Sequence, residues 1–435
     1  MLAKMMNLNE EEARKFFILA LTFLFLIGVY WLLRSVKDSV LASTVGLKWQ
    51  PTAKICSLFF LVPLILLYSS LVDTLKKNHL FYYIAGFYGC LFLLIGYLLG
   101  RPGIGLSNTV EDPYRMIGWA TYLGIESFGS LMVALFWSLV ANATSPESAK
   151  KGYPFIVFGA QFGSITGPLL AANAAVFGVP MLMMFGSMGI FCMLGLMYYY
   201  SNTVPNHLTG FDQDETVDGE APKRTGILEG LRLLFSHKYI AGIFCIATFY
   251  EFVGTILDYQ MKVLARQTFT DPNSFAGFMG TFGVGCNVST LLFSLMGTSY
   301  IMKRFGLTFC IVLFPVCVGC VVFVVYVYAS MWVFFGGVIV IKCFTYALNN
   351  PAKEIMYIPT SKDIKFKTKS WIDMFGSRSM KALGSSVNNA FVGSPEALLK
   401  YGTMASLCIV VVWIFVASFV GKKFESLTAN NETVG

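Results

Sequence analysis

Residues 351–370 read PAKEIMYIPTSKDIKFKTKS, a polar and lysine-rich stretch, and the helix that we predict after it carries Asp373, Arg378 and Lys381. Arg378 and Lys381 are three residues apart, so an α-helix places them on one face. Charged side chains inside a bilayer are costly and tend to face a polar cavity. This stretch therefore predicts a membrane helix with a polar face, and other helices of the chain would have to enclose that face.

The composition is that of a polytopic membrane protein. Of the 435 residues, 56% are hydrophobic and 13% are charged, whereas soluble domains carry about 25% charged residues. The net charge of +8 is the kind of excess that cytoplasmic loops of membrane proteins carry, and it does not indicate nucleic-acid binding. The N-terminal segment contains three consecutive glutamates, Glu10 to Glu12, and lacks a cleavage site, so we expect no signal peptide.

Apolar runs long enough to cross a bilayer, roughly 20 residues each, occur about twelve times. We therefore predict an all-α polytopic membrane protein with about twelve transmembrane helices in two six-helix halves, similar to major facilitator proteins. The halves are residues 1–200 and 239–435, joined by a cytoplasmic linker at 201–238. Within that linker, residues 226–236 predict an amphipathic helix at the membrane surface. The predicted spans are Phe16–Val36, Ile55–Val72, Leu80–Gly100, Arg115–Ala141, Pro154–Phe177, Pro180–Tyr200, Tyr239–Met261, Ser274–Met296, Phe305–Ala329, Met331–Leu348, Trp371–Val392 and Tyr401–Gly421.

The loop charges predict the orientation. Lysine and arginine concentrate in alternate loops, the lysine-rich stretch at 351–370 among them, and sparsely populate the others. Cytoplasmic loops carry such an excess, so we expect both termini on the cytoplasmic side.

Cofactor and metal motifs are missing from the sequence. The pair Cys317 and Cys320 has CxxC spacing but lies within a predicted helix, without a second pair or a nearby histidine, which favours packing over metal binding. Neither a phosphate-binding glycine loop nor a Ser/His/Asp arrangement is found. We therefore expect no cofactor, no metal and no enzyme activity. The glycine stripe Gly159, Gly163, Gly167 instead predicts close helix packing.

Charged residues within the predicted helices are the candidate site, because an intramembrane charge is a functional candidate by default. Near balance between the two signs suggests that they pair when the site is empty, and that a polyanionic substrate would break those pairs. Asp258 and Lys262 are four residues apart and are better explained as a plain helical ion pair. The cations are Arg34, Lys37, Lys342, Arg378 and Lys381, and the anions are Asp38, Glu126, Glu251 and Asp373.

Four of these candidates also have a structural explanation. Arg34 and Lys37 could be charges that reach toward the membrane surface at the end of the first helix. Glu126 lies near mid-span with no charge close by in its helix, and it could pair with another helix for stability alone. For Lys342 a structural ion pair and a ligand contact are equally compatible with the sequence.

Several of these segments together resemble one family over essentially the whole chain. The segment 357–381, YIPTSKDIKFKTKSWIDMFGSRSMK, is the most specific, and LRSVKD at 33–38, PTAK at 51–54 and ESFGS at 126–130 also match. They resemble the ATP:ADP antiporter family, the nucleotide transporters of plastids and of obligate intracellular bacteria. The resemblance implies a major facilitator-like fold and import of host nucleotides, often ATP in exchange for ADP and phosphate.

The resemblance also implies particular site residues. The functionally important charges of the family correspond by motif to Lys37, Glu126, Glu251 and Lys381. After Glu251 this sequence differs, because FVGTILD follows it where the family commonly has a tryptophan and lysines.

We therefore predict a nucleotide transporter that works by alternating access, with its substrate site between the two halves. Lys37 and Lys381 would hold the phosphates, and Glu126 and Glu251 would pair with them in the empty state or carry protons. Arg34, Lys342 and Arg378 are further candidates for substrate binding. The expected partners are a nucleotide substrate, phosphate or protons as a co-substrate, and the lipid bilayer. The expected location is the inner membrane of an intracellular bacterium. The alternatives are a proton-coupled importer of another nucleotide or phosphorylated anion, and a membrane receptor or enzyme without transport.

Overall fold

The computed structural model describes residues 9–74, 77–209, 236–296, 298–361 and 368–430, together with 234, 364 and 432–434. Contacts divide the chain into two units: unit 1 contains Met1–Val217 and Phe269–Asn287, and unit 2 contains Asp218–Thr268 and Val288–Gly435. Within the described residues both units are helical, and one isolated β-bridge joins Thr360 to Val434. The helix predicted at 226–236 lies largely outside the described residues.

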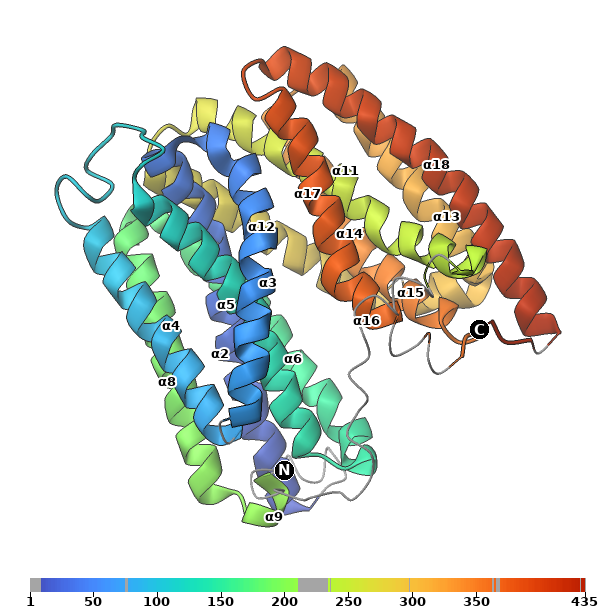
Figure 1. Ribbon diagram of the computed structural model, residues 1–435, viewed down its shortest axis with the longest axis horizontal. Helices are drawn as coiled ribbons and strands as arrows, with labels where there is room; N and C mark the ends of the chain where they lie inside the picture. Colours follow the sequence, from blue (N-terminus) through green and yellow to red (C-terminus); the bar gives the residue numbers. More distant parts are fainter. Residues whose placement is uncertain are drawn as a thin grey trace. The chain divides into compact units, whose positions relative to one another are not determined.

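Unit 1 is a bundle of long antiparallel helices, in which α4 and α8 lie side by side (Figure 1). Asn9 begins the first of them, because its side chain accepts a hydrogen bond from the Glu12 backbone N–H at 3.1 Å, and Ser145 caps α6 in the same way. The helices are α2 Glu10–Leu41, α3 Gln50–Thr74, α4 Lys77–Leu99, α5 Met116–Asn142, α6 Pro146–Ala172, α7 Ala174–Phe177, α8 Val179–Thr203 and α9 Asn206–Thr209.

The predicted glycine stripe is confirmed as the contact between α6 and α2. A Cβ atom added at Gly163 would lie 2.2 Å from the Leu24 carbonyl oxygen, and one added at Gly167 would lie 2.1 Å from the Gly28 carbonyl oxygen. Any side chain larger than a hydrogen would therefore meet backbone atoms. Small residues allow such close approach in membranes, where packing and not apolar burial drives helix association.

The turn between α2 and α3 depends on a special backbone conformation. After Leu41 the helix widens into the π-helix η1, Ala42–Gly46, and tightens into the 3-10 helix η2, Leu47–Trp49. Gly46 has φ of 105°, in a region that L side chains rarely adopt, so a glycine is needed where the chain reverses.

Unit 2 contains the helices of the second half, with α13 and α18 side by side (Figure 1). Its helix α14 continues through a π-helix, η3, into α15, and α16 continues through another, η5, into α17. The elements are α11 Lys238–Thr268, α13 Thr298–Val327, α14 Met331–Phe344, η3 Thr345–Asn349, α15 Asn350–Met356, α16 Lys369–Trp371, η5 Ile372–Gly376, α17 Ser377–Ala390 and α18 Pro395–Ala429. The helix α12, Pro272–Met296, contributes its residues up to Asn287 to unit 1 and the remainder to unit 2.

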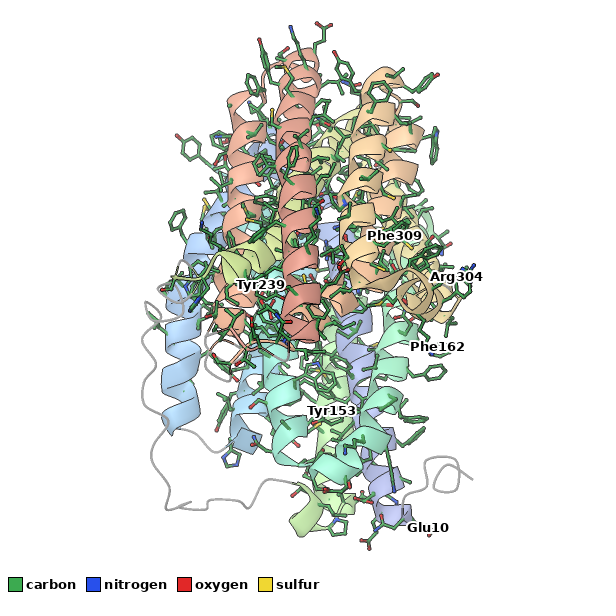
Figure 2. The ribbon with its side chains drawn as sticks, turned by 90° about the vertical axis from the view of Figure 1, so that its right-hand side faces the viewer. Glu10, Tyr153, Phe162, Tyr239, Arg304 and Phe309 are labelled. Carbon is green, nitrogen blue, oxygen red and sulfur yellow. The ribbon has the colours of Figure 1, made fainter. Side chains whose placement is uncertain are left out.

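The outward surface is apolar, as a bilayer requires. Phe162 of α6 is 50% exposed and Phe309 of α13 is 43% exposed, and Figure 2 shows both on the outer surface of their helices. Many other large apolar side chains of the described residues are also exposed, which indicates contact with lipid and not with water.

Ten segments of the described chain are long and apolar enough to cross a membrane. The first, Glu10–Tyr68, contains the first predicted span and most of the second, so the ten segments account for eleven of those predicted. The remaining one, Trp371–Val392, does form helix as α16, η5 and α17. It falls short because a π-helix interrupts it and because serine, asparagine and charged residues occupy much of α17, so our description of it as an apolar helix was wrong.

Candidate functional site

In unit 1, Lys37 of α2 and Glu126 of α5 form an ion pair. The Lys37 side chain is only 7% exposed and that of Glu126 is 27% exposed. The Lys37 ammonium also lies 4.4 Å from the centroid of the Tyr122 ring. Tyr122 precedes Glu126 by one turn, so α5 presents an aromatic face and a carboxylate to the same cation. The structure thus brings Lys37 and Glu126 together as an ion pair.

The other two charges at the end of α2 lie close to this pair in sequence. Arg34 donates a hydrogen bond to the Tyr30 hydroxyl at 3.3 Å, and its guanidinium lies 4.9 Å from the Trp31 ring. Asp38 is 2% exposed, so its side chain is enclosed by the protein. The burial of Lys37 and Asp38 contradicts the explanation of this cluster as surface-seeking charges. The π-helix η1 follows directly, and such distortions are frequent at functional sites.

In unit 2, Lys381 of α17 and Glu251 of α11 form the second ion pair, at 3.1 Å. The same Glu251 oxygen accepts a hydrogen bond from the Tyr250 hydroxyl at 2.8 Å. Lys342 of α14 adds a second positive charge in the field of Glu251. The Glu251 side chain is 13% exposed, whereas that of Lys381 is 41% exposed. Lys381 is therefore the more accessible partner. The Glu251 carboxylate keeps the Tyr250 hydrogen bond and the charge of Lys342 when Lys381 moves away.

Arg378 and Lys342 each lie next to a break in helical geometry. Arg378 is half-buried one turn before Lys381, directly after η5, and Lys342 lies in the last turn of α14 before η3. Beside Lys342 the helix changes from α to π geometry, and beside Arg378 it changes from π to α.

The remaining charges that we singled out have structural partners. Lys262 and Asp258 form the predicted i, i+4 pair at 2.6 Å, both largely buried. Asp373 contacts Lys353 at 2.8 Å, so the structure places it with the lysine-rich stretch and not with Lys381. In the same region Lys369 contacts Glu354 at 2.5 Å. Burial raises the pKa of Tyr357, over whose ring the Lys369 ammonium lies. Part of this stretch, between 362 and 367, lies outside the described residues.

Sequence reasoning missed Tyr122 and Tyr250 as partners of the charged pairs. Tyr122 carried a signal, because it is four residues before Glu126, and Tyr250 is adjacent to Glu251. Lys15 was missed as well: it is 1% exposed and donates to the Ala143 carbonyl oxygen at 2.9 Å, which makes it a structural bond of unit 1.

Metal chemistry finds no support in the part of the chain that the structure describes, where no group of three histidine, cysteine or carboxylate side chains could hold an ion. What the two pairs can do is bind an anion. Each offers a lysine ammonium that is neutralised by a carboxylate and that a stronger anionic ligand could recruit.

The helical fold and its ten candidate spans in the described residues define a polytopic membrane protein, and solved structures share this fold. A bacterial homologue of the iron transporter ferroportin aligns with a TM-score of 0.66 at 15% identity, covering 94% of this chain and 98% of that one. The nucleoside transporter NupG aligns with a TM-score of 0.61 at 13% identity, covering 94% and 100%. At such identities the likeness concerns the fold, which is major facilitator-like as predicted.

Sequence comparison identifies the family. The family model described as TLC ATP/ADP transporter matches residues 1–101 and 119–424, and the chain belongs to that family. ADP,ATP carrier protein 3 of Rickettsia bellii is 21% identical over 97% of this chain and 96% of its own length. The chloroplastic ADP,ATP carrier protein 1 of Arabidopsis thaliana is 25% identical over 99% of this chain and 77% of its own length. The chain is thus a multi-pass nucleotide transporter and not an enzyme, as the sequence predicted.

Proposed function

We propose that this protein exchanges ATP for ADP across a membrane, and that Lys37 and Lys381 bind the nucleotide phosphates. The observation that carries the proposal is that each lysine is paired with a carboxylate inside its own unit, Lys37 with Glu126 and Lys381 with Glu251. A lysine ammonium is a point charge suited to phosphate. The carboxylates satisfy those charges while no substrate is bound.

The order of the charges differs between the two units. In unit 1 the lysine is on the unit's first long helix, α2, and the carboxylate on α5; in unit 2 the carboxylate is on α11 and the lysine on α17. A substrate phosphate that recruits Lys37 leaves Glu126, which is already partly exposed. One that recruits Lys381 leaves Glu251 with the Tyr250 hydroxyl and the Lys342 charge. Both carboxylates therefore keep solvation or partners, which lowers the cost of breaking the pairs.

A ligand shifts a conformational equilibrium only by its differential affinity for the two states. When Lys37 or Lys381 exchanges its carboxylate partner for a substrate phosphate, the contacts of α2 with α5 or of α11 with α17 change. The substrate can therefore have different affinities for the two states. Substrate binding would in this way permit alternating access. We further propose Arg34, Lys342 and Arg378 as auxiliary cations for the phosphates, and residues 1–200 and 239–435 as the halves that the linker joins.

Phosphate or protons are candidate co-substrates, with Glu126 and Glu251 as the groups that would carry a proton. We place the protein in the inner membrane of a bacterium with both termini cytoplasmic. The Rickettsia relatives and the alternation of loop charge support this location.

The test is counterflow of labelled ATP into proteoliposomes loaded with unlabelled ADP. Wild-type protein should accumulate label, and Lys381→Ala should lose roughly ten- to hundredfold in apparent affinity, since a hydrogen bond to a charged group is worth about 1.5–3 kcal/mol. Lys400→Ala, an exposed lysine on α18 of the same unit, is the matched control and should transport normally. Normal counterflow by correctly inserted Lys381→Ala would remove this lysine from the site.

Two additions separate the alternatives. A panel of unlabelled nucleotides identifies the preferred substrate by competition. An uncoupler that abolishes uptake while leaving counterflow intact would favour a proton-coupled importer over an exchanger.

A further inference from the structure

Unit 2 contains a line of buried polar atoms that neither ion pair uses. It lies along α11, where α17 and α18 pack against that helix. Within the described residues, five side-chain oxygens in this seam are buried without a hydrogen-bond partner. They belong to Gln260, Ser385, Asn388, Thr403 and Ser406, whose residues are each at most 4% exposed.

Contacts connect Asn388 and Gln260 to neighbouring helices, and helical spacing relates Ser406 to Gly402, which it follows by four residues on α18. Asn388 of α17 donates its amide hydrogen to the Thr255 carbonyl oxygen at 3.2 Å, and Gln260 donates to the Leu398 carbonyl oxygen at 2.9 Å. Gly402 of α18 lies against Gln260, because a Cβ added there would be 2.7 Å from the Gln260 amide nitrogen. Gln260 is thus held by α18 and Asn388 by α11, and the remaining acceptor oxygen of each amide has no partner in the described chain.

One end of the path reaches the charged site. Ser385 follows Lys381 by four residues, so both lie on the same face of α17. The positions on α11 proceed in the same direction, from Glu251, which pairs with Lys381, through Thr255 to Gln260.

The other end opens into a cavity. Its volume is about 220 Å³, and its lining includes Gln260, Gln267, Glu396 and apolar side chains of α11, α14 and α18. A cavity needs only on the order of 10–15 Å³ of such volume to hold one water. By volume the cavity has room for several waters beside its polar residues Gln260, Gln267 and Glu396, and Gln260 also belongs to the seam.

We propose that ordered water fills the seam and forms a continuous polar path from this cavity to the vicinity of Lys381. Buried polar groups in native proteins are almost always satisfied by protein or by water, and a run of orphaned oxygens marks a place where water binds. The five residues are hydroxyls and amides and carry no charge, which favours a neutral ligand over a metal cation.

Such a path would have a definite use in transport. It supplies water to the Lys381 ammonium and the Glu251 carboxylate when substrate separates them, and it offers protons a route to that pair. This use rests on the proposed function, whereas the presence of water in the seam does not.

The experiment measures water in the seam directly. Full-length protein in lipid nanodiscs carrying Ser406→Cys is treated with a small water-soluble thiol reagent, and the modified position is located by peptide mass spectrometry, so the native cysteines do not interfere. Cysteine nearly preserves the size of serine. The matched control is Val410→Cys, a buried position one turn further along α18.

We expect modification at position 406, none at 410, and a severalfold slower reaction at 406 when Gln260→Leu closes the entrance. Equal lack of reaction at 406 and 410 would overturn the proposal, as would reaction at 406 that depends on sodium or potassium, since that would indicate a cation site. If Ser406→Cys inserts poorly, Thr403→Cys provides the same measurement. As an independent check, Ser406→Ala should not raise the unfolding temperature; a rise would show that the hydroxyl is unsatisfied and dry.

Because labelling needs no transport, it separates the two proposals. A labelled seam in a protein whose Lys381→Ala variant transports normally would retain the water path and reject the site. A dry seam together with lost transport in Lys381→Ala would do the reverse.

Discussion

The Glu126→Gln substitution gives the most discriminating test of the unit 1 ion pair. It leaves the Lys37 ammonium, 7% exposed, without its carboxylate. Removing one partner of a buried pair costs about 3–5 kcal/mol, because an uncompensated charge stays buried. The Tyr122 ring at 4.4 Å remains and offsets about 1–2 kcal/mol of this cost. The expected net loss is roughly 1–4 kcal/mol.

The converse substitution should cost less. Lys37→Met leaves the Glu126 carboxylate, which is 27% exposed and so partly hydrated. The double variant Lys37→Met/Glu126→Gln buries no charge and should recover most of the stability, since replacing a whole buried pair is often close to neutral. Stability and transport then separate, because all three variants lack the proposed phosphate cation or its partner and should fail in counterflow.

The assay is the unfolding temperature of purified protein in detergent, measured for the two single variants and the double variant as a cycle. For Glu126→Gln we expect a fall on the order of a few degrees. Glu147→Gln, an exposed glutamate in the first turn of α6, should change stability by less than about 1 kcal/mol. A double variant as unstable as Glu126→Gln would refute the reasoning, because the burial of an unpaired Lys37 could not then be the cause.

Three further changes address other parts of the molecule. Gly163→Ala places a Cβ 2.2 Å from the Leu24 carbonyl oxygen, so α2 and α6 must separate and we expect a loss of about 1–3 kcal/mol in the unfolding assay; Gly195→Ala, with open space around it, is the control. Arg115→Ala removes the guanidinium that donates to five carbonyl oxygens, four of them in the loop before α5, and limited proteolysis should show faster cleavage of that loop with the unfolding temperature little changed. Lys381→Ala leaves the Glu251 carboxylate, 13% exposed, with the Tyr250 hydroxyl and the charge of Lys342, so it should cost less than the roughly 3–5 kcal/mol of an uncompensated buried charge, and a loss of that size would mean that this lysine is chiefly structural.

The sequence was sufficient for the helical class and for the candidate residues. Bilayer spans must be about 20 apolar residues long because backbone groups in lipid have to be satisfied within the helix, so hydropathy alone located most of them. Intramembrane charges are costly, which made nine charged residues stand out, and the family resemblance singled out Lys37, Glu126, Glu251 and Lys381 among them. The glycine stripe on α6 likewise predicted close packing before its partner helix was known.

Only the tertiary structure decided which charges pair. Helical spacing can predict contacts within one helix, as it did for Asp258 with Lys262, but not contacts between residues 89 positions apart such as Lys37 and Glu126. The sequence likewise listed Asp373 among the candidate anions without naming a partner, and the structure pairs it with Lys353. The buried polar seam along α11 was equally invisible, because serines and an asparagine in α17 signify nothing until α11 and α18 cover them. Local sequence fixes which side chains are costly to bury, and the packing of helices decides what satisfies them.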